Sequence, residues 1–211
     1  MVLATANCGK IVELRALIQP YPFRLLSLPD LWPRPPMPEE TGRTYEANAV
    51  IKARAIASDT GFLTLADDSG LEVDCLQGRP GVWSSRYGRT DEERVGRLLQ
   101  EVGNRRPAGA RFVCVVAIAR PDGGTKTFEG ECRGMIVATP YGDGGFGFDP
   151  VFVPDEGSGE TMAQLSRDEK NRISHRARAV ARAMSWLVSS EGGAWVDETL
   201  FSFSSPRGTL R

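Results

Sequence analysis

The segment RFVCVVAIARPDGGTKTFEGECRGMIV, residues 111–137, decides the fold class of this chain of 211 residues. Its first part, 111–119, is almost continuously apolar and is typical of a buried strand. PDGG at 121–124 predicts a tight turn, and 127–137 has the composition of a strand that pairs back on the first. We therefore expect an antiparallel hairpin in the middle of the sheet.

Upstream of this hairpin, strand and helix patterns alternate. Strands are indicated at 2–5 and 62–66, and helices at 11–18 and 45–57. Thr44 is expected to cap the second helix. The proline-dense segment 28–40 is unsuited to a helix interior or a central strand, so we expect a stiff surface loop there. Early alternation and a later hairpin predict a mixed α/β fold with α+β character.

Downstream, the pattern continues with helices and one glycine-rich loop. Thr90 and Glu93 form a capping-box signature for a helix over 90–102. Residues 142–154 are expected to be a loop that runs into a strand, and helices are expected from Ser166 to about Val188. These elements predict a single domain over 1–190, followed by a peripheral C-terminal tail over 191–211.

Composition narrows the class of protein. An apolar content of 41% and a charged content of 25% are typical of a globular, water-soluble domain. A formal net charge of −1 provides no overall attraction to nucleic acid or to an anionic membrane. The four cysteines lack C-x-x-C spacing and there is one histidine, so we expect free thiols and no zinc site. Without an evident signal peptide or membrane span, a cytoplasmic location is expected.

TANCGK, residues 5–10, has the character of an anion-binding turn. Lys10 falls in the first turn of a helix, where the helix dipole disfavours a cation by about 0.3–1 kcal/mol unless an anion is near. Thr5 and Asn7 add polar side chains, and Gly9 allows close approach of the backbone, so a phosphate cradle is indicated. The spacing differs from that of a Walker A loop. The alternative is a surface lysine after an ordinary strand–helix turn.

ADDSG, residues 66–70, places two carboxylates directly after the predicted strand over 62–66. Adjacent carboxylates repel one another unless a cation is close. Oxygen ligands without nearby histidine or thiolate suit Mg²⁺, which binds through one or two carboxylates plus phosphates and waters. Glu39 and Glu40 are both candidates for the second ligand. The alternative is that one of Asp67 and Asp68 caps a turn while the other faces water.

GDGGFG at 142–147 contains a literal G-x-G-x-x-G. It neither follows a clear strand nor opens a helix, so a dinucleotide-binding reading is rejected. An aromatic ring and a carboxylate, such as Phe146, Phe148 and Asp149 provide, suit a purine by stacking and by accepting from its edge, but this motif alone favours core positions for both rings.

The run SRDEKNRISHRARAVAR, residues 166–182, concentrates basic side chains. Such a run can bind phosphates, bind RNA, or form a solvated helix face. Lys170 is expected in one turn, and His175 and Arg176 at the start of the next helix, where an anionic ligand is favoured.

The order of these motifs resembles the inosine/xanthosine triphosphate pyrophosphatase family, the Ham1-like proteins. The blocks are TANCGK, EETG, EANAVIKARA, ADDSG with GLEVD, RPGVWSSRY, GGFGFDPVF and LSRDEKNRISHR, and the similarity extends from Val2 to about Leu187. The resemblance implies an elongated mixed sheet flanked by helices, with two lobes, an active-site cleft between them and usually a homodimer. It also implies Mg²⁺-dependent hydrolysis of ITP, dITP and XTP to the monophosphate and pyrophosphate, with no stable nucleic-acid partner.

Carried onto this sequence, the resemblance makes Asp68 the general base and gives Glu39 and Asp68 as metal ligands. The substrate contacts that it implies are Thr5, Ala6, Asn7, Cys8, Gly9, Lys10, Lys52, Ser69, Phe146, Gly147, Phe148, Asp149, Lys170, His175 and Arg176. His175 and Arg176 are candidate donors to a 6-oxo group on the base, whereas rejection of GTP must depend on the 2-position. The alternatives are a Maf-type pyrophosphatase for another modified nucleotide and a non-catalytic nucleotide- or RNA-binding module.

Overall fold

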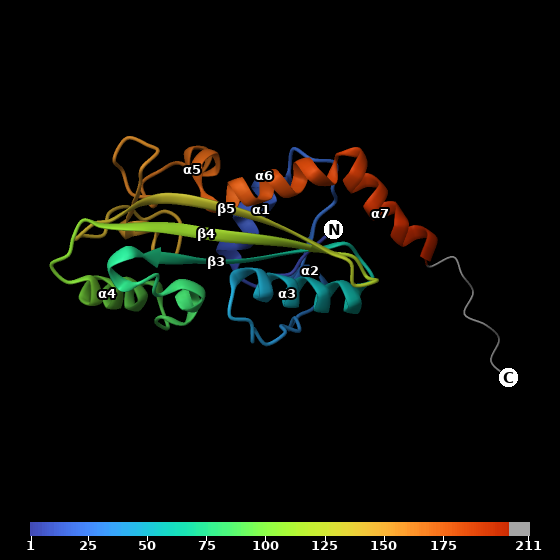
Figure 1. Ribbon diagram of the computed structural model, residues 1–211, viewed down its shortest axis with the longest axis horizontal. Helices are drawn as coiled ribbons and strands as arrows, with labels where there is room; N and C mark the ends of the chain where they lie inside the picture. The colour runs from blue at the N-terminus through green and yellow to red at the C-terminus, as the bar shows by residue number, and fades with distance from the viewer. Residues whose placement is uncertain (203–211) are drawn as a thin grey trace.

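A six-stranded sheet with helices on both faces forms the body of the protein, seen here in a computed structural model (Figure 1). The structure describes residues 1–202, with side chains up to residue 197. The strands are β1 (Val2–Leu3), β2 (Leu26–Ser27), β3 (Thr64–Val73), β4 (Ala108–Ala119), β5 (Thr125–Ile136) and β6 (Phe152–Pro154). The helices are α1 (Cys8–Ile18), α2 (Leu28–Leu31), α3 (Tyr45–Thr60), α4 (Asp91–Val102), α5 (Arg167–Ile173), α6 (His175–Leu187) and α7 (Ser190–Ser202).

The sheet is mixed, as predicted. Its strand order is β2-β1-β3-β4-β5-β6, with β1 parallel to β2 and β3 and every other pair antiparallel. The hairpin of β4 and β5 is confirmed, with Ala119 opposite Thr125 next to the turn. Its strands are longer than the sequence pattern indicated, since β4 already begins at Ala108.

The strand that carries the acidic pair continues beyond the predicted end at residue 66. β3 extends to Val73, and β4 pairs with it throughout, placing Asp67 opposite Val116 and Asp68 opposite Val115. β1 pairs with β3 only at Thr64 and Leu65. The acids therefore lie beyond the end of β1 and within β3, and the prediction that β3 ends before them was wrong.

Most predicted helix starts are confirmed in detail. Thr44 accepts a hydrogen bond from the Ala47 amide, and Ser166 forms a full capping box with Glu169. At α4, Thr90 accepts from the Glu93 amide, but the Glu93 carboxylate accepts from the amide of Arg89 and not from that of Thr90. The proline-dense loop also begins with a short helix, α2, because Pro29 occupies its first turn, where no intrahelical donor is needed.

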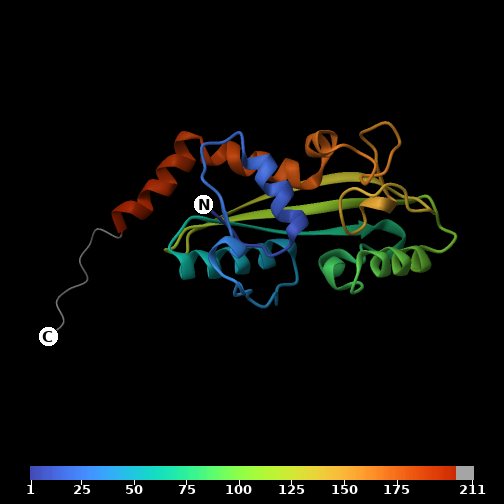
Figure 2. The same cartoon turned by 180° about the vertical axis from the view of Figure 1, so that it is seen from behind.

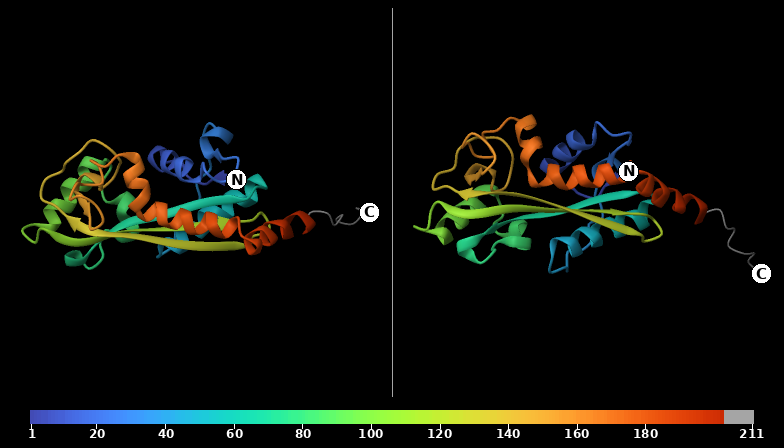
Figure 3. Two further views of the ribbon diagram at one scale, coloured as in Figure 1. Left: turned by 90° about the horizontal axis from the view of Figure 1, so that it is seen from above. Right: turned by 45° about the horizontal axis from the view of Figure 1, so that its top comes forward.

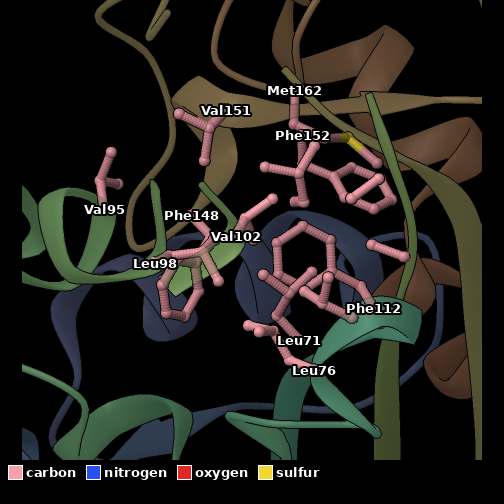
Figure 4. Packing of buried hydrophobic residues seen from close by; sticks show 14 of the residues in the cluster. Leu71, Leu76, Val95, Leu98, Val102, Phe112, Phe148, Val151, Phe152 and Met162 are labelled. Atoms are coloured by element: carbon pink, nitrogen blue, oxygen red, sulfur yellow. The ribbon is translucent and has the colours of Figure 1, made fainter. Parts of the chain in front are cut away.

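Three buried clusters stabilise the two halves of the sheet. At the α4 end, Leu98 packs with strand side chains such as Leu71 and with Phe112 and Phe152, whose ring centroids lie 4.6 Å apart (Figure 4). In the other half, α3 covers one face, and α1 and α6 cover the opposite face (Figures 1 and 2). Because β3 and β4 contribute to clusters in both halves, the long strands run through the whole elongated molecule (Figure 3).

The segment after residue 190 contains a helix. α7 continues from α6 past the end of the sheet (Figure 3), and the Trp195 ring packs against Trp186 at 5.2 Å between centroids. Arg120 donates to the Trp195 carbonyl. The part of the predicted peripheral tail over 203–211 lies outside the described residues.

Within the described part of the chain, no helix is both long and apolar enough to cross a membrane. All four cysteines are free thiols.

Candidate active site

A cavity of about 260 Å³ opens where β1 ends and β3 continues. Segment 5–10 turns away from the sheet into α1 there, so the edge of β3 beyond Leu65 has no β1 neighbour. Further along β3, the Leu71 amide donates to Ser84 Oγ of η2 (Gly81–Arg86) at 2.9 Å. The uncovered edge between these contacts faces the cavity. Its lining includes Thr5, Ala6, Asn7, Lys10, Glu40, Lys52, Asp68, Ser69, Arg94, Phe112, Phe146, Gly147, Phe148, Asp149, Lys170, His175 and Arg176.

Alternation along β3 separates the two adjacent acids. Successive side chains of a strand point to opposite faces, so Asp67 lies on the α1 and α6 side and Asp68 on the α3 side. Asp67 is 1% exposed, and its Oδ2 atom lies 2.9 Å from Lys10 Nζ and 3.2 Å from Arg176 Nη2. Burial alone would raise the pKa of Asp67, but these two cations hold it well below its ordinary value. Asp67 is therefore an anion at neutral pH.

Asp68 shares a lysine with Glu40. Lys52 Nζ lies 3.1 Å from Asp68 Oδ1 and 2.7 Å from Glu40 Oε1, while Asn48 donates to Asp68 Oδ2 at 3.2 Å. Arg86 also contacts the Glu40 carboxylate, at 3.1 Å. Burial raises the pKa of Asp68 in spite of Lys52, and the like charge of Glu40 adds to this effect. A raised pKa makes Asp68 a stronger proton acceptor than an ordinary aspartate.

The aromatic part of the cavity adjoins the turn over 5–10 and is rigidly supported. Phe146 lies against Gly9 so closely that a Cβ on that glycine would come within 2.6 Å of the ring. Lys170 Nζ sits 5.2 Å from the Phe146 ring centroid. The same ammonium bonds Asp149 at 2.5 Å and Glu13 at 2.7 Å. Buried ion pairs therefore hold the 146–149 segment to α1 and α5.

His175 and Arg176, at the start of α6, have different surroundings. The His175 ring stacks on Phe112 with 4.7 Å between centroids, and its buried Nδ1 atom has no partner among the described residues. Burial, together with Arg176 and Lys170, lowers its pKa well below the ordinary value, so the imidazole is neutral. Arg176 is 1% exposed, and all three guanidinium nitrogens are engaged, by Asp67, Glu13 and Ser69. His175 thus has a vacant polar atom, whereas Arg176 anchors the acids.

The cavity brings together most of the predicted site residues. Cys8 and Gly9 do not line it, although both belong to the turn that does, and Glu39 is exposed and outside it. Its neighbour Glu40 lines the cavity instead. Sequence reasoning also missed two further residues of the network, the buried Glu13 and Asn48.

The donor set of the cavity fits a hard divalent cation. Glu40 and Asp68 converge on one ammonium, so a positive charge is already favoured between them, and the buried Oδ1 atom of Asp67 has no partner in the described part of the chain. Among the described residues, no group of three or more His, Cys, Asp or Glu side chains is placed to hold a metal ion. Two carboxylates suffice for an ion that completes its shell with phosphate oxygens and waters.

Comparison with known proteins agrees with this geometry. The family model described as the Ham1 family matches residues 1–186. This chain belongs to the Ham1 family. Among curated relatives, it is 46% identical to the dITP/XTP pyrophosphatase of Gloeobacter violaceus over 185 residues, which cover 88% of this chain and 92% of that protein. It is 44% identical to the dITP/XTP pyrophosphatase of Bacillus licheniformis, covering 89% of this chain and 97% of that one.

Solved structures show the same fold. A Ham1 protein from Coxiella burnetii superimposes with a TM-score of 0.78 at 37% identity, covering 88% of this chain and 96% of that one. The Ham1 protein of Staphylococcus aureus gives a TM-score of 0.76 at 40% identity, with the same two coverages. The family model ends at residue 186, so α7 lies outside the matched region.

Proposed function

We propose that this protein hydrolyses dITP, ITP and XTP to the nucleoside monophosphate and pyrophosphate, which would remove deaminated purines from the nucleotide pool. The observation that carries the proposal is the convergence of Glu40 and Asp68 on Lys52 in a cavity that also presents Phe146 and the neutral His175. The carboxylates suit a metal–polyphosphate, and the aromatic ring suits a purine. The names of the curated relatives agree with this substrate class.

The triphosphate would bind at the end of the cavity that holds Lys10 and Lys52. Both lysines are paired with carboxylates, at 2.9 and 3.1 Å, and both line the cavity, so a polyanion can draw on them without moving the backbone. Asn7 accepts from the Lys10 amide at 3.0 Å and thereby fixes the first turn of α1. The remaining polar groups of this turn are placed to bind phosphate oxygens.

Asp68 is the group proposed to accept a proton from the attacking water. Its raised pKa suits a general base, and Asn48 and Lys52 orient its carboxylate. Glu40 and Asp68 would hold Mg²⁺, which when bound offsets negative charge on the phosphate oxygens. The water oxygen forms a bond to the α-phosphorus. The bond between the α-phosphorus and the oxygen that bridges to the β-phosphate breaks, and pyrophosphate leaves. Glu40 replaces Glu39, which the resemblance indicated, as the proposed partner of Asp68.

The base would lie against Phe146, with the start of α6 at its edge. The unpartnered Nδ1 atom of His175 and its neutral ring provide a polar group that does not require a charged ligand. A donor aimed at the 6-oxo group favours hypoxanthine and xanthine, because adenine presents an amino group at that position. Arg176 would act on base selection only indirectly, since its nitrogens are engaged by Asp67, Glu13 and Ser69.

The geometry does not favour the alternative of an RNA-binding module. The basic run over 166–182 does not form one exposed patch, because Lys170 and Arg176 are buried in ion pairs and Arg178 contacts Glu156 at 2.6 Å. Homodimer formation stays a prediction from the resemblance, and a cytoplasmic location stays a prediction from the sequence.

Product analysis tests the proposed reaction. We expect pyrophosphate and monophosphate from dITP, ITP and XTP, at rates at least tenfold above those for ATP and GTP, and loss of turnover when EDTA removes Mg²⁺. In ¹⁸O-labelled water, the label should enter the monophosphate, because the water attacks the α-phosphorus. Release of inorganic phosphate, or a label in pyrophosphate, would exclude this reaction. A pyrimidine triphosphate as the best substrate would support the Maf-type alternative.

Gly9→Ala is expected to weaken substrate binding. The added methyl would lie 2.6 Å from the Phe146 ring and force it out of place, and overpacking of this kind costs about 1–3 kcal/mol. We expect KM for dITP to rise about tenfold or more with kcat changed less. Gly96→Ala is the matched control, because this helical glycine has nothing within 4 Å of its Cβ position. Equal KM values for the two variants would show that Phe146 does not contact the substrate.

A further inference from the structure

The aromatic end of the cavity contains one arginine that the proposed mechanism does not use. Arg94 lies on α4 and lines the cavity, with 22% of its side chain exposed. The proposed phosphate-binding residues lie on other elements, segment 5–10, α3 and the middle of β3. A cation that α4 contributes to the cavity therefore requires a separate explanation.

Contacts place Arg94 beside the glycine between the two cavity phenylalanines. Its Nε atom donates to the Gly88 carbonyl at 3.1 Å, and Nη1 pairs with Oδ1 of Asp91. The other oxygen of Asp91 accepts from the Gly147 amide at 2.7 Å. Gly147 has φ of +66°, a conformation that other residues rarely adopt. Asp91 thus links the guanidinium to the loop that carries Phe146 and Phe148.

One nitrogen of this guanidinium remains available. For the part of the chain with described side chains, Nη2 of Arg94 has no hydrogen-bond partner, whereas Nε and Nη1 are both engaged. These two bonds fix the plane of the group. Arg94 lines the cavity, and Nη2 is the nitrogen of its guanidinium that the described residues leave for a ligand there.

We propose that Arg94 reads the 2-position of the purine base. This inference rests on the proposed function. Xanthine carries a 2-oxo acceptor that pairs with the Nη2 donor, and hypoxanthine carries a hydrogen that neither pairs with it nor repels it. Guanine carries a 2-amino donor, which would face a second donor and a positive charge. Guanine shares the 6-oxo group of the substrates. Rejection of GTP therefore requires a residue that contacts the 2-position of the base.

Competing roles for Arg94 give different signatures. If it only held Asp91 and the 146–149 loop, its removal would weaken every purine nucleotide by the same factor. If it bound phosphates, its removal would weaken tripolyphosphate as much as a nucleotide. Only a residue that contacts the 2-position of the base changes the order of affinities for xanthosine, inosine and guanosine nucleotides.

Arg94→Met tests the proposal through binding of XMP, IMP and GMP, measured by calorimetry, and through kcat/KM for the three triphosphates. We expect XMP affinity to fall about tenfold to a hundredfold, IMP affinity to change less than threefold, and GMP affinity to rise several-fold. The monophosphate arm does not depend on turnover, so it decides the role of Arg94 even if no pyrophosphate is released. An XMP to IMP affinity ratio within twofold of wild type would overturn the assignment.

Two further variants test whether a change in structure, and not the loss of a contact to the base, explains the altered affinities. Arg97→Met is the matched control, because Arg97 lies one turn further along α4, with its guanidinium over the Tyr87 ring at 4.2 Å and outside the cavity lining. It should leave all three affinities unchanged. If thermal melting shows that Arg94→Met does not fold, Arg94→Lys keeps the charge without the planar fork and should show the same loss of XMP relative to IMP. An unchanged ratio in Arg94→Lys would then overturn the proposal.

Discussion

Asp68→Asn is expected to lower kcat for dITP by about 10²–10⁴-fold, because an amide cannot accept the proton that the attacking water must lose. The fold should persist. Asn keeps the shape of the side chain, and Lys52 retains its contact with Glu40 at 2.7 Å, so no buried cation is left without a partner. Steady-state pyrophosphate release and thermal melting, measured on the same sample, separate the two effects. A kcat within tenfold of wild type would exclude Asp68 as the base.

The neighbouring glutamates provide a matched pair for the metal assignment. Glu40→Gln should reduce activity at limiting Mg²⁺ and recover part of it at high Mg²⁺, since one of the two proposed ligands is weakened. Glu39→Gln changes the same chemical group one residue earlier, on a side chain that is exposed and outside the cavity. It should stay within about twofold of wild type. If Glu39→Gln lowered the activity more than Glu40→Gln did, Glu39 would be the metal ligand in place of Glu40.

Arg176→Met is expected to destabilise the protein by about 3 kcal/mol or more, because it removes a buried cation that neutralises two buried acids. Arg176 contacts Asp67 through Nε and Nη2 and Glu13 through Nη1. Lys10 and Lys170 would each retain one of these acids, which keeps the loss near the lower end of the range for broken buried pairs. Urea denaturation measures the change in the free energy of unfolding.

Arg178→Met is the control for this stability prediction. Arg178 follows two residues later on α6 and pairs with Glu156, whose side chain is 61% exposed. Surface pairs of this kind contribute about 0–1 kcal/mol. A loss below 1 kcal/mol for Arg176→Met, equal to that of the control, would mean that Arg176 does not anchor the acids.

Local sequence patterns were sufficient for most elements but not for β3. The predicted strand stopped before Asp67 because acidic residues followed by serine and glycine are typical of a turn. Pairing with β4 and the cations at Lys10 and Lys52 override that preference. The cavity nevertheless lies beside the end of a strand. The relevant end belongs to β1, which stops opposite Leu65.

The details of the site depend on contacts distant in sequence. No local rule distinguishes Glu39 from Glu40, because the choice is made by Lys52 and Arg86, which lie 12 and 46 residues from Glu40. The same holds for Glu13, whose partner Arg176 is 163 residues away. Residue types and motif order therefore predicted most residues that line the cavity, whereas the ion pairs among them depend on the tertiary fold.

β3 and β4 run without interruption through both halves of the molecule, and this constrains how the family can diversify. Asp67 and Asp68 therefore lie within a continuous pair of strands that packs into the cores of both halves. The irregular backbone of 142–149 and the first turn of α4 are attached beside it. Under the proposed function, changes in these segments would alter base selection while the carboxylates on β3 keep their positions.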